Sequence, residues 1–239
     1  DSGRSAVSRE VTIGDKPVAM KFDLPPPSEI TFDIRKEDGS PTPCKAQFLG
    51  IEGTPAPNLG PTDRAHGCKD QYHSESGKFS VALPPGTYRV VLTRGIEFDH
   101  FEEKVRLDEG KTVEIKATLR RTVSSPGWVS TDFHNHSTPS GDNVCGTDDR
   151  IINLAAEHIE FAPTTEHNRI YDWSPHIEKL GLSGEISTIP GIELTGSGAH
   201  LNAFPLKPKP FRQDGGAPSW VKDPRINAIN LRNWDGHRS

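Results

Sequence analysis

The sequence has few cysteines, no long hydrophobic run and no block of charge of one sign. Because no apolar run reaches bilayer length, we expect no membrane-spanning segment. The 28 basic and 33 acidic residues are interspersed and give a formal net charge of -5. Neither nucleic acid nor an anionic membrane surface is therefore an expected partner. The 21 prolines and 22 glycines are typical of a turn-rich, β-containing protein.

The three cysteines leave the redox environment open. Cys44 and Cys68 lie in a loop-rich region, and a disulfide between them would fit an extracytoplasmic protein, either periplasmic or secreted. Two free thiols in a reducing compartment fit about as well, and Cys145 stands alone. An extracytoplasmic location is the expectation, with a cytoplasmic one as its alternative.

Residues 25–122 have the pattern of a β domain. Apolar and polar residues alternate in short runs separated by turns rich in glycine and proline, at 29–35, 78–83, 87–93, 103–107 and 112–119. Such spacing predicts a β-sandwich. The stretch Leu83-Pro-Pro-Gly-Thr-Tyr-Arg-Val90 resembles the carboxypeptidase-regulatory-like sandwich family, whose members are mostly accessory modules. This resemblance implies a fold and no reaction.

Residues 10–24 repeat the pattern of residues 104–119, apart from a one-residue insertion. The second copy closes the sandwich, so the first would close an earlier sandwich that this chain lacks. Chance similarity between two hairpins of one fold is an equally good interpretation. Residues 1–24 are thus either a terminal hairpin or a remnant of a preceding β domain, and in both cases we expect them to pair as a hairpin.

The composition changes after a linker at 123–127. From residue 128 onward, predicted strands and helices alternate: a strand ending at Phe133, a helix over 148–160 with Thr147 or Asp148 as N-cap, a strand over 161–165, a helix over 172–180, strands at 186–189, 192–194 and 199–204, and a helix over 223–234. This order predicts an α/β unit with a largely parallel sheet, in which ligands gather at the carboxyl ends of the strands.

Six residues with metal-ligating side chains fall at those strand ends or in the adjoining loops: His134, His136, Asp142, His167, Glu193 and His200. His134 and His136 are two residues apart in extended chain, so both imidazoles face the same side. Zinc, manganese and iron accept such mixtures of nitrogen and oxygen ligands. Glu193 is suited to bridge two ions because each carboxylate oxygen can bind one. His158, on a predicted helix, is expected to be structural, as are the sandwich histidines His66, His73 and His100, whose spacing matches no metal pattern.

These ligands stand in recognisable blocks: Asp132-Phe-His-Asn-His-Ser-Thr138 with Asp142, Thr165-Glu-His-Asn168, Pro190-Gly-Ile-Glu193 and His200-Leu-Asn202. In order and approximate spacing they resemble the polymerase and histidinol phosphatase (PHP) domain superfamily, over about residues 126–239. The Gly127-Trp-Val-Ser-Thr-Asp132 opening and the preceding sandwich look most like its carbaryl-hydrolase-like branch. The resemblance implies a multidomain β + α/β chain, in which the β-sandwich is followed by a distorted (β/α)7 barrel.

The resemblance also implies a division of the ligands. His134 and His136 would hold one ion, Asp142 and His167 a second, Glu193 would bridge, and His200 would belong to a third. The sequence departs from the family in having Thr-Glu166-His167 where Thr-Asp-His is usual. No Asn-His-Pro block follows, and the pair Asp235 and His237 comes too soon to be the closing ligands. We therefore expect residues 128–239 to be the N-terminal portion of a truncated barrel.

The predicted activity is that of a metal-dependent hydrolase, in which a metal-bridged hydroxide attacks a phosphoester or a carbamate, ester or amide bond of a small substrate. The complete domain would hold two to three ions of zinc, manganese or iron. Glu166 or His200 would relay protons as catalytic residues, and Arg169 would contact an anionic group of the substrate. The alternative is an extracytoplasmic β-sandwich binding module joined to an incomplete, inactive metal domain.

Overall fold

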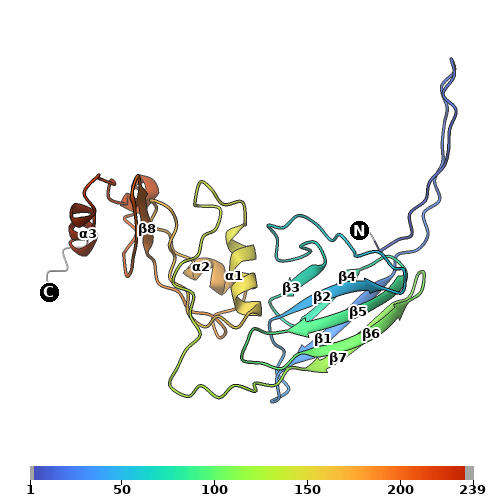
Figure 1. The fold of residues 1–239 in the computed structure, drawn as a ribbon, viewed down its shortest axis with the longest axis horizontal. Coiled ribbons are helices and arrows are strands. Elements are labelled where there is room, and N and C mark those ends of the chain that lie inside the picture. The colour runs from blue at the N-terminus through green and yellow to red at the C-terminus, as the bar shows by residue number, and fades with distance from the viewer. Residues whose placement is uncertain (1–2, 235–239) are drawn as a thin grey trace.

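The computed structural model describes residues 3–234 (Figure 1). A β-sandwich occupies one end, a smaller region with short helices occupies the other, and an N-terminal arm projects away from the sandwich. Asp235 and His237, the pair expected not to close the site, lie outside the described residues.

Two sheets form the sandwich. The three-stranded sheet has the order β4-β1-β7 and consists of β1 (Glu29–Arg35), β4 (Lys78–Ala82) and β7 (Thr112–Thr118). In it, β1 pairs antiparallel with β4 and parallel with β7. The four-stranded sheet is antiparallel and has the order β3-β2-β5-β6, with β2 (Cys44–Ile51), β3 (Gln71–Ser74), β5 (Gly86–Thr93) and β6 (Phe101–Leu107).

The alternating residues of these strands build one core between the sheets. Ile30, Phe32 and Ile34 of β1 point inward and are at most 4% exposed, and they pack in the same cluster as Phe48 and Leu92. Each such side chain stabilises the fold by about 1.5–3 kcal/mol through the removal of apolar surface from water. The predicted β-sandwich is confirmed.

The three cysteines are free. Cys44 lies fully buried in the sandwich core, and this burial raises the pKa of its thiol to about 12. The disulfide between Cys44 and Cys68 is not formed, so the cysteines give no argument for an oxidising compartment.

The arm doubles back on itself, with two runs lying side by side (Figure 1). Residues 6–24 are exposed throughout and contain no strand, so the two runs lie side by side without a β-ladder. Gly3 and Ser5 tie its root to the sandwich, because Ser28 N donates to Gly3 O (2.6 Å) and Ser5 Oγ donates to Glu109 Oε2 (3.0 Å).

The region after residue 128 is not a (β/α)7 barrel, and this prediction was wrong. Its elements are α1 (Thr147–Ala156), α2 (Ser174–Lys179), β8 (Ile192–Gly196), β9 (Ala199–Ala203), the 3-10 turn η1 (Gln213–Gly216) and α3 (Pro224–Arg232). The strands β8 and β9 pair antiparallel as a separate two-stranded sheet, and no barrel is present in residues 3–234. Over the same residues, no helix has the length and apolar character needed to cross a membrane.

Parallel pairing is present here only as single β-bridges. Thr131 pairs with Phe161, Phe161 with Ser187, and His167 with Glu193. The predicted strands 161–165 and 186–189 do not extend into ladders. Pro163 and Pro190 stand in and beside them without an N–H to donate, which is the physical reason for the interruption. The predicted N-cap was also wrong, since Gly146 precedes α1 without a side-chain cap.

The two regions share a packed and charged interface. Arg94, 1% exposed, donates to Pro43 O (2.7 Å) in the sandwich and to Glu185 Oε2 (2.6 Å) in the second region. Lys36 Nζ donates to the other oxygen of Glu185 (2.8 Å). Ala65, in the loop between β2 and β3, is fully buried in the core cluster that contains α1. The linker at 123–127 is therefore not a flexible joint between independent bodies.

Candidate metal centre

His134 and His136 are oriented by the asparagine between them. Asn135 is buried, its N–H donates to Thr165 Oγ1 (2.9 Å), and its side-chain amide donates to the carbonyls of Asp132 and Pro163. Because successive residues of an extended chain face opposite sides, fixing Asn135 inward turns both neighbouring imidazoles toward the other side.

His167 and Glu193 are brought together by a parallel bridge. Glu193, in β8, donates its N–H to Glu166 O (3.0 Å), and Asn168 N donates to Glu193 O (2.9 Å). These bonds place the ends of two segments side by side, as expected where strand ends carry ligands.

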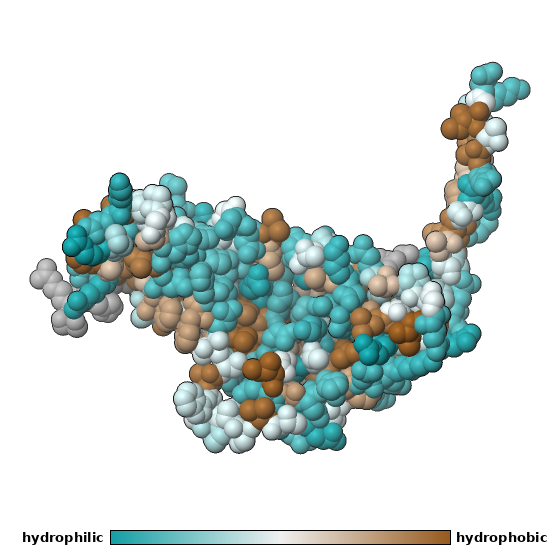
Figure 2. All heavy atoms as spheres, in the orientation of Figure 1, coloured by the Kyte–Doolittle hydropathy of each residue, from teal (hydrophilic) through white to brown (hydrophobic). Residues whose placement is uncertain are grey.

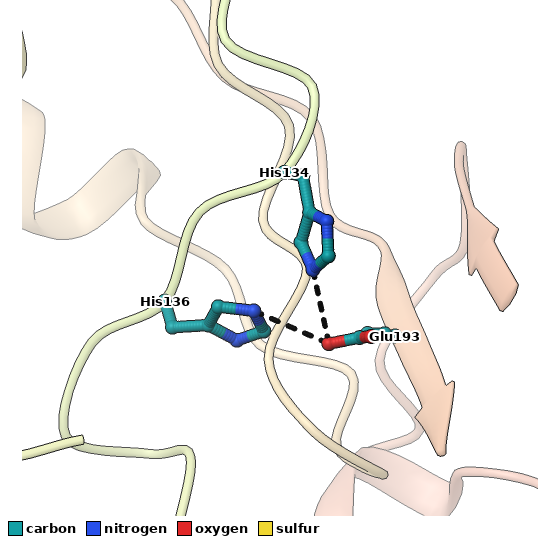
Figure 3. A group of neighbouring side chains, drawn as sticks. All are labelled: His134, His136 and Glu193. Carbon is teal, nitrogen blue, oxygen red and sulfur yellow. Dashed lines mark ion pairs between the residues drawn. The ribbon is translucent and has the colours of Figure 1, made fainter. Parts of the chain in front are cut away.

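The carboxylate of Glu193 is the centre of the site, with its residue 1% exposed. Its Oε2 lies 3.1 Å from His134 Nε2, 3.2 Å from His136 Nε2 and 3.1 Å from His167 Nδ1. Figure 3 shows the first two imidazoles converging on this oxygen from the loop that faces β8. The other oxygen, Oε1, lies 2.7 Å from His200 Nδ1.

Asp142 completes the group from the opposite edge. Its Oδ2 lies 3.1 Å from His167 Nε2, so all six predicted ligands form one connected cluster. The side chains of His134, His200 and Asp142 are 54%, 56% and 68% exposed, whereas Glu193 is buried. The cluster is thus open to solvent on one side and anchored on the other.

His136 Nε2 and Glu193 Oε2 face each other without a proton between them. Ser140 Oγ gives its single hydrogen to Glu166 Oε2 (2.5 Å), so His136 Nδ1, 3.1 Å away, is the donor to Ser140 Oγ. The neutral ring of His136 then presents the lone pair of Nε2 to Glu193 Oε2. The buried Oε2 thus faces His136 through a contact that is not a hydrogen bond, and His134 Nε2 at 3.1 Å is the nitrogen placed to donate to it.

His167 is held between two oxygen groups. Its Nδ1 lies 2.6 Å from Thr195 Oγ1, which is itself 3.3 Å from Glu193 O, and its Nε2 lies 3.1 Å from Asp142 Oδ2. The contact of His136 Nε2 with Glu193 Oε2 brings two acceptors to 3.2 Å from each other. Such a pair repels unless a cation lies with it, so the donor set fits divalent metal ions.

The protonation states also suit metal binding, which requires deprotonated ligands. Burial lowers the pKa of His136, and the neighbouring ring of His167 lowers it further, which favours the neutral imidazole. Burial by itself raises the pKa of Glu193, but the imidazoles of His134, His200 and His167 outweigh it and hold this pKa below its usual range. Glu193 is therefore ionised at neutral pH.

Glu166, predicted as a proton relay, lies behind the site. It is fully buried and accepts hydrogen bonds from Ser137 N, from Ser137 Oγ (2.5 Å) and from Ser140 Oγ (2.5 Å). Ser140 Oγ also accepts from His167 N (3.0 Å). Glu166 thus positions two ligating histidines through one serine.

Arg169, predicted to contact substrate, is engaged elsewhere. Its Nε and Nη2 both donate to Asp214 Oδ1, at 3.1 and 2.8 Å. The guanidinium is therefore neutralised by a residue outside the metal cluster, and no contact joins it to the six ligands in the described part of the chain.

A second group with metal-ligating side chains, Glu97, His158 and Glu160, lies at the interface of the two regions. Its carboxylates already have partners. Glu97 Oε2 accepts from Arg121 Nη2 (2.9 Å) and lies 2.7 Å from His158 Nδ1, and Glu160 Oε2 accepts from Ser130 N (2.9 Å). These contacts describe an interface ion pair, in line with the structural role expected of His158.

Sequence reasoning named the members of the cluster but not the residues that hold them. Ser140 fixes the tautomer of His136, Thr195 holds the ring of His167, and Asn168 exchanges two hydrogen bonds with Thr195. Thr195 had a detectable signal, since it follows Glu193 by two residues in a strand and so shares its face.

No family model matches this chain, and no curated protein shows significant similarity to it.

Proposed function

We propose that this protein is a metal-dependent hydrolase whose ions are held by His134, His136, Asp142, His167, Glu193 and His200. The observation that carries this proposal is the convergence of imidazole nitrogens of His134, His136 and His167 within 3.2 Å of the buried Oε2 of Glu193. The position of Asp142 Oδ2, 3.1 Å from His167 Nε2, supports a second ion beside the first.

A divalent ion bound here supplies an activated water molecule and polarises the scissile bond. The chain's own residues fix the geometry. Glu193 offers one oxygen to the histidine group and the other to His200, the arrangement that a bridging carboxylate needs. His200 is exposed and held through Nδ1, so its Nε2 would either bind an ion or, where no ion binds there, exchange a proton with solvent. Glu166 acts as a positioning residue because it is fully buried behind Ser137 and Ser140.

The substrate class we favour is a carbamate, ester or amide over a phosphoester. A phosphoester carries negative charge at its reacting group, and basic side chains usually bind that charge. Arg169 is the cation that the sequence offers for this task, and its guanidinium is paired with Asp214.

The alternative, a binding module with a degenerate metal domain, is disfavoured by the side-chain directions. In a degenerate site Asp142 and Glu193 would have no common target. Instead, Asp142 Oδ2 and Glu193 Oε2 each lie 3.1 Å from a nitrogen of His167.

The test measures metal content and hydrolysis on the same preparations. The natural full-length protein, freed of metal and reloaded with zinc, manganese or iron(II), is dialysed and analysed by inductively coupled plasma mass spectrometry. It is then assayed on an aryl ester and on a phosphodiester. We expect about two tightly held ions per chain and cleavage of the ester.

Three substitutions make this test specific. Glu193→Gln keeps the shape of the side chain but removes its charge, and it should reduce metal affinity by more than the 10–100-fold typical for an outer partner. His134→Ala changes an exposed ligand, so folding should persist while hydrolysis is lost. Glu178→Gln, on the exposed surface of α2, is the matched control. Absence of both retained metal and hydrolysis with all three ions would refute the proposal.

A further inference from the structure

The N-terminal arm exposes an unusual number of large apolar side chains. Figure 2 shows brown residues in several places along it, between teal ones. They are Val7, Val11, Ile13, Val18, Met20, Phe22 and Leu24, with exposures between 38% and 90%. Exposed apolar side chains gathered on one element mark a surface that another protein element covers.

The internal repeat tells which kind of element that is. The corresponding positions of the two copies are Val11 and Val105, Ile13 and Leu107, Val18 and Val113, Met20 and Ile115, Phe22 and Ala117, and Leu24 and Leu119. In the second copy, five of these six residues are at most 8% exposed and the sixth, Val113, packs against the same core. In the first copy all six are between 40% and 90% exposed.

The apolar side chains of the second copy are buried because its two strands join two different sheets. β6 pairs antiparallel with β5 at the end of the four-stranded sheet, and β7 pairs parallel with β1 at the end of the three-stranded sheet. The turn between them, Asp108 to Lys111, crosses from one sheet to the other. A segment with this pattern buries its apolar residues only when it lies across the edge of a sandwich.

The arm has the residue pattern of two strands at the edge of a sandwich. In the sandwich of this chain, β6 and β7 already occupy that edge. The root of the arm is held beside Ser28 and Glu109, so residues 6–24 extend away from that sandwich (Figure 1).

We propose that residues 10–24 are the last two strands of a second β-sandwich of the same kind, whose other strands precede Asp1 in the same polypeptide. Residues 10–13 would pair antiparallel with the equivalent of β5, and residues 18–24 would pair parallel with the equivalent of β1. The protein then contains tandem sandwiches ahead of the metal centre, because a repeat of this kind reflects duplication of a whole structural unit.

Hydrogen–deuterium exchange with mass spectrometry tests the proposal, on the 239-residue chain and on the natural full-length protein. In the 239-residue chain, amides of residues 10–13 and 18–24 should exchange as fast as in an unstructured peptide. In the full-length protein they should exchange at least about 100-fold more slowly, as β6 and β7 do in both.

Paired substitutions identify the face involved. In the full-length protein, Ile13→Asp should abolish the protection of residues 18–24, whereas Thr12→Asp, on the opposite side of the arm, should leave it. Unprotected arm amides in the full-length protein would overturn the proposal. Protection that appears in the 239-residue chain with rising protein concentration would also overturn it, in favour of arm exchange between two copies.

Discussion

Ser140 shows how much of the candidate metal centre depends on a single hydroxyl. Its Oγ donates to Glu166 (2.5 Å) and accepts from the backbone N–H of His167 (3.0 Å) and from His136 Nδ1 (3.1 Å). One atom therefore sets the tautomer of one ligand and the position of another. These three hydrogen bonds form together only because the hydroxyl donates its own hydrogen to a buried carboxylate.

We predict that Ser140→Ala weakens metal binding by about 10–100-fold, the range typical for partners of metal ligands. The substitution removes the acceptor that keeps the proton of His136 on Nδ1, so Nε2 loses its fixed lone pair. Competition with a chromogenic chelator measures the affinity. Thr138→Ala, an exposed neighbour in the same loop, is the control. Unchanged affinity in Ser140→Ala would contradict the role assigned to this hydroxyl.

At this scale the sequence predicted the members of the cluster better than the residues that support them. Six histidine and carboxylate residues could be named because their chemistry is intrinsic to the side chain. The role of Ser140 depends on Glu166, and the loss of Arg169 as a substrate contact depends on Asp214, a partner distant in sequence. Neither pairing leaves a periodic signal, since both arise only when loops are folded together.

At the scale of elements, the site is supported by short parallel contacts in place of full strands. Phe161 is bridged to both Thr131 and Ser187, and β8 begins directly after Pro190 and Gly191. The backbone at Gly191 is crowded: an added Cβ would lie 2.6 Å from Thr164 O and 2.7 Å from Ala203 O. Neither backbone oxygen can move without displacing its own segment.

We therefore predict that Gly191→Ala destabilises the protein by about 3 kcal/mol, at the upper end for overpacking of a buried position. The matched control is Gly184→Ala, where an added Cβ meets nothing within 4 Å. Surface changes of that kind stay within about 0.5 kcal/mol. Chemical denaturation of both variants measures the difference. Equal stabilities would show that the Gly191 backbone relaxes.

The elements of the sandwich were predictable because alternation of apolar and polar residues is a local signal. β1 and β5–β7 follow it closely. β2 was missed because its inward residues begin with Cys44 and Ala46, which are weak markers of a buried face. The parallel sheet was predicted wrongly because the apolar runs at 161–165 and 186–189 are real, yet the prolines beside them prevent the hydrogen-bonded ladder.

At the scale of the whole molecule, the interface between the two regions responds to pH. Burial lowers the pKa of His158, and the charge of Arg94 lowers it further. The unfolded chain therefore binds a proton on this histidine at a higher pH than the folded chain does. Where the unfolded state binds more protons, stability rises with pH, so stability falls as pH decreases through the ordinary histidine pKa of about 6.5.

We predict that the free energy of unfolding decreases from pH 7.5 to 5.5, and that His158→Gln removes part of this slope. The part removed cannot exceed about 1.4 kcal/mol per pH unit, the limit for one proton. Chemical denaturation at several pH values measures this slope. His100→Gln, a change at an exposed histidine, is the control. Stability that rises on acidification, or an unchanged slope in His158→Gln, would contradict the prediction.

Ala65 gives the interface a consequence for how this protein can be divided. The residue belongs to the β2–β3 loop by connectivity and to the core around α1 by packing, and its N–H donates to Asp149 Oδ1 (2.8 Å). A cut at residues 123–127 would therefore leave a cavity in the half that carries the candidate metal centre and an uncovered loop on the sandwich. The two regions are therefore not interchangeable modules. Recombination that replaced one region alone would separate two surfaces that pack against each other.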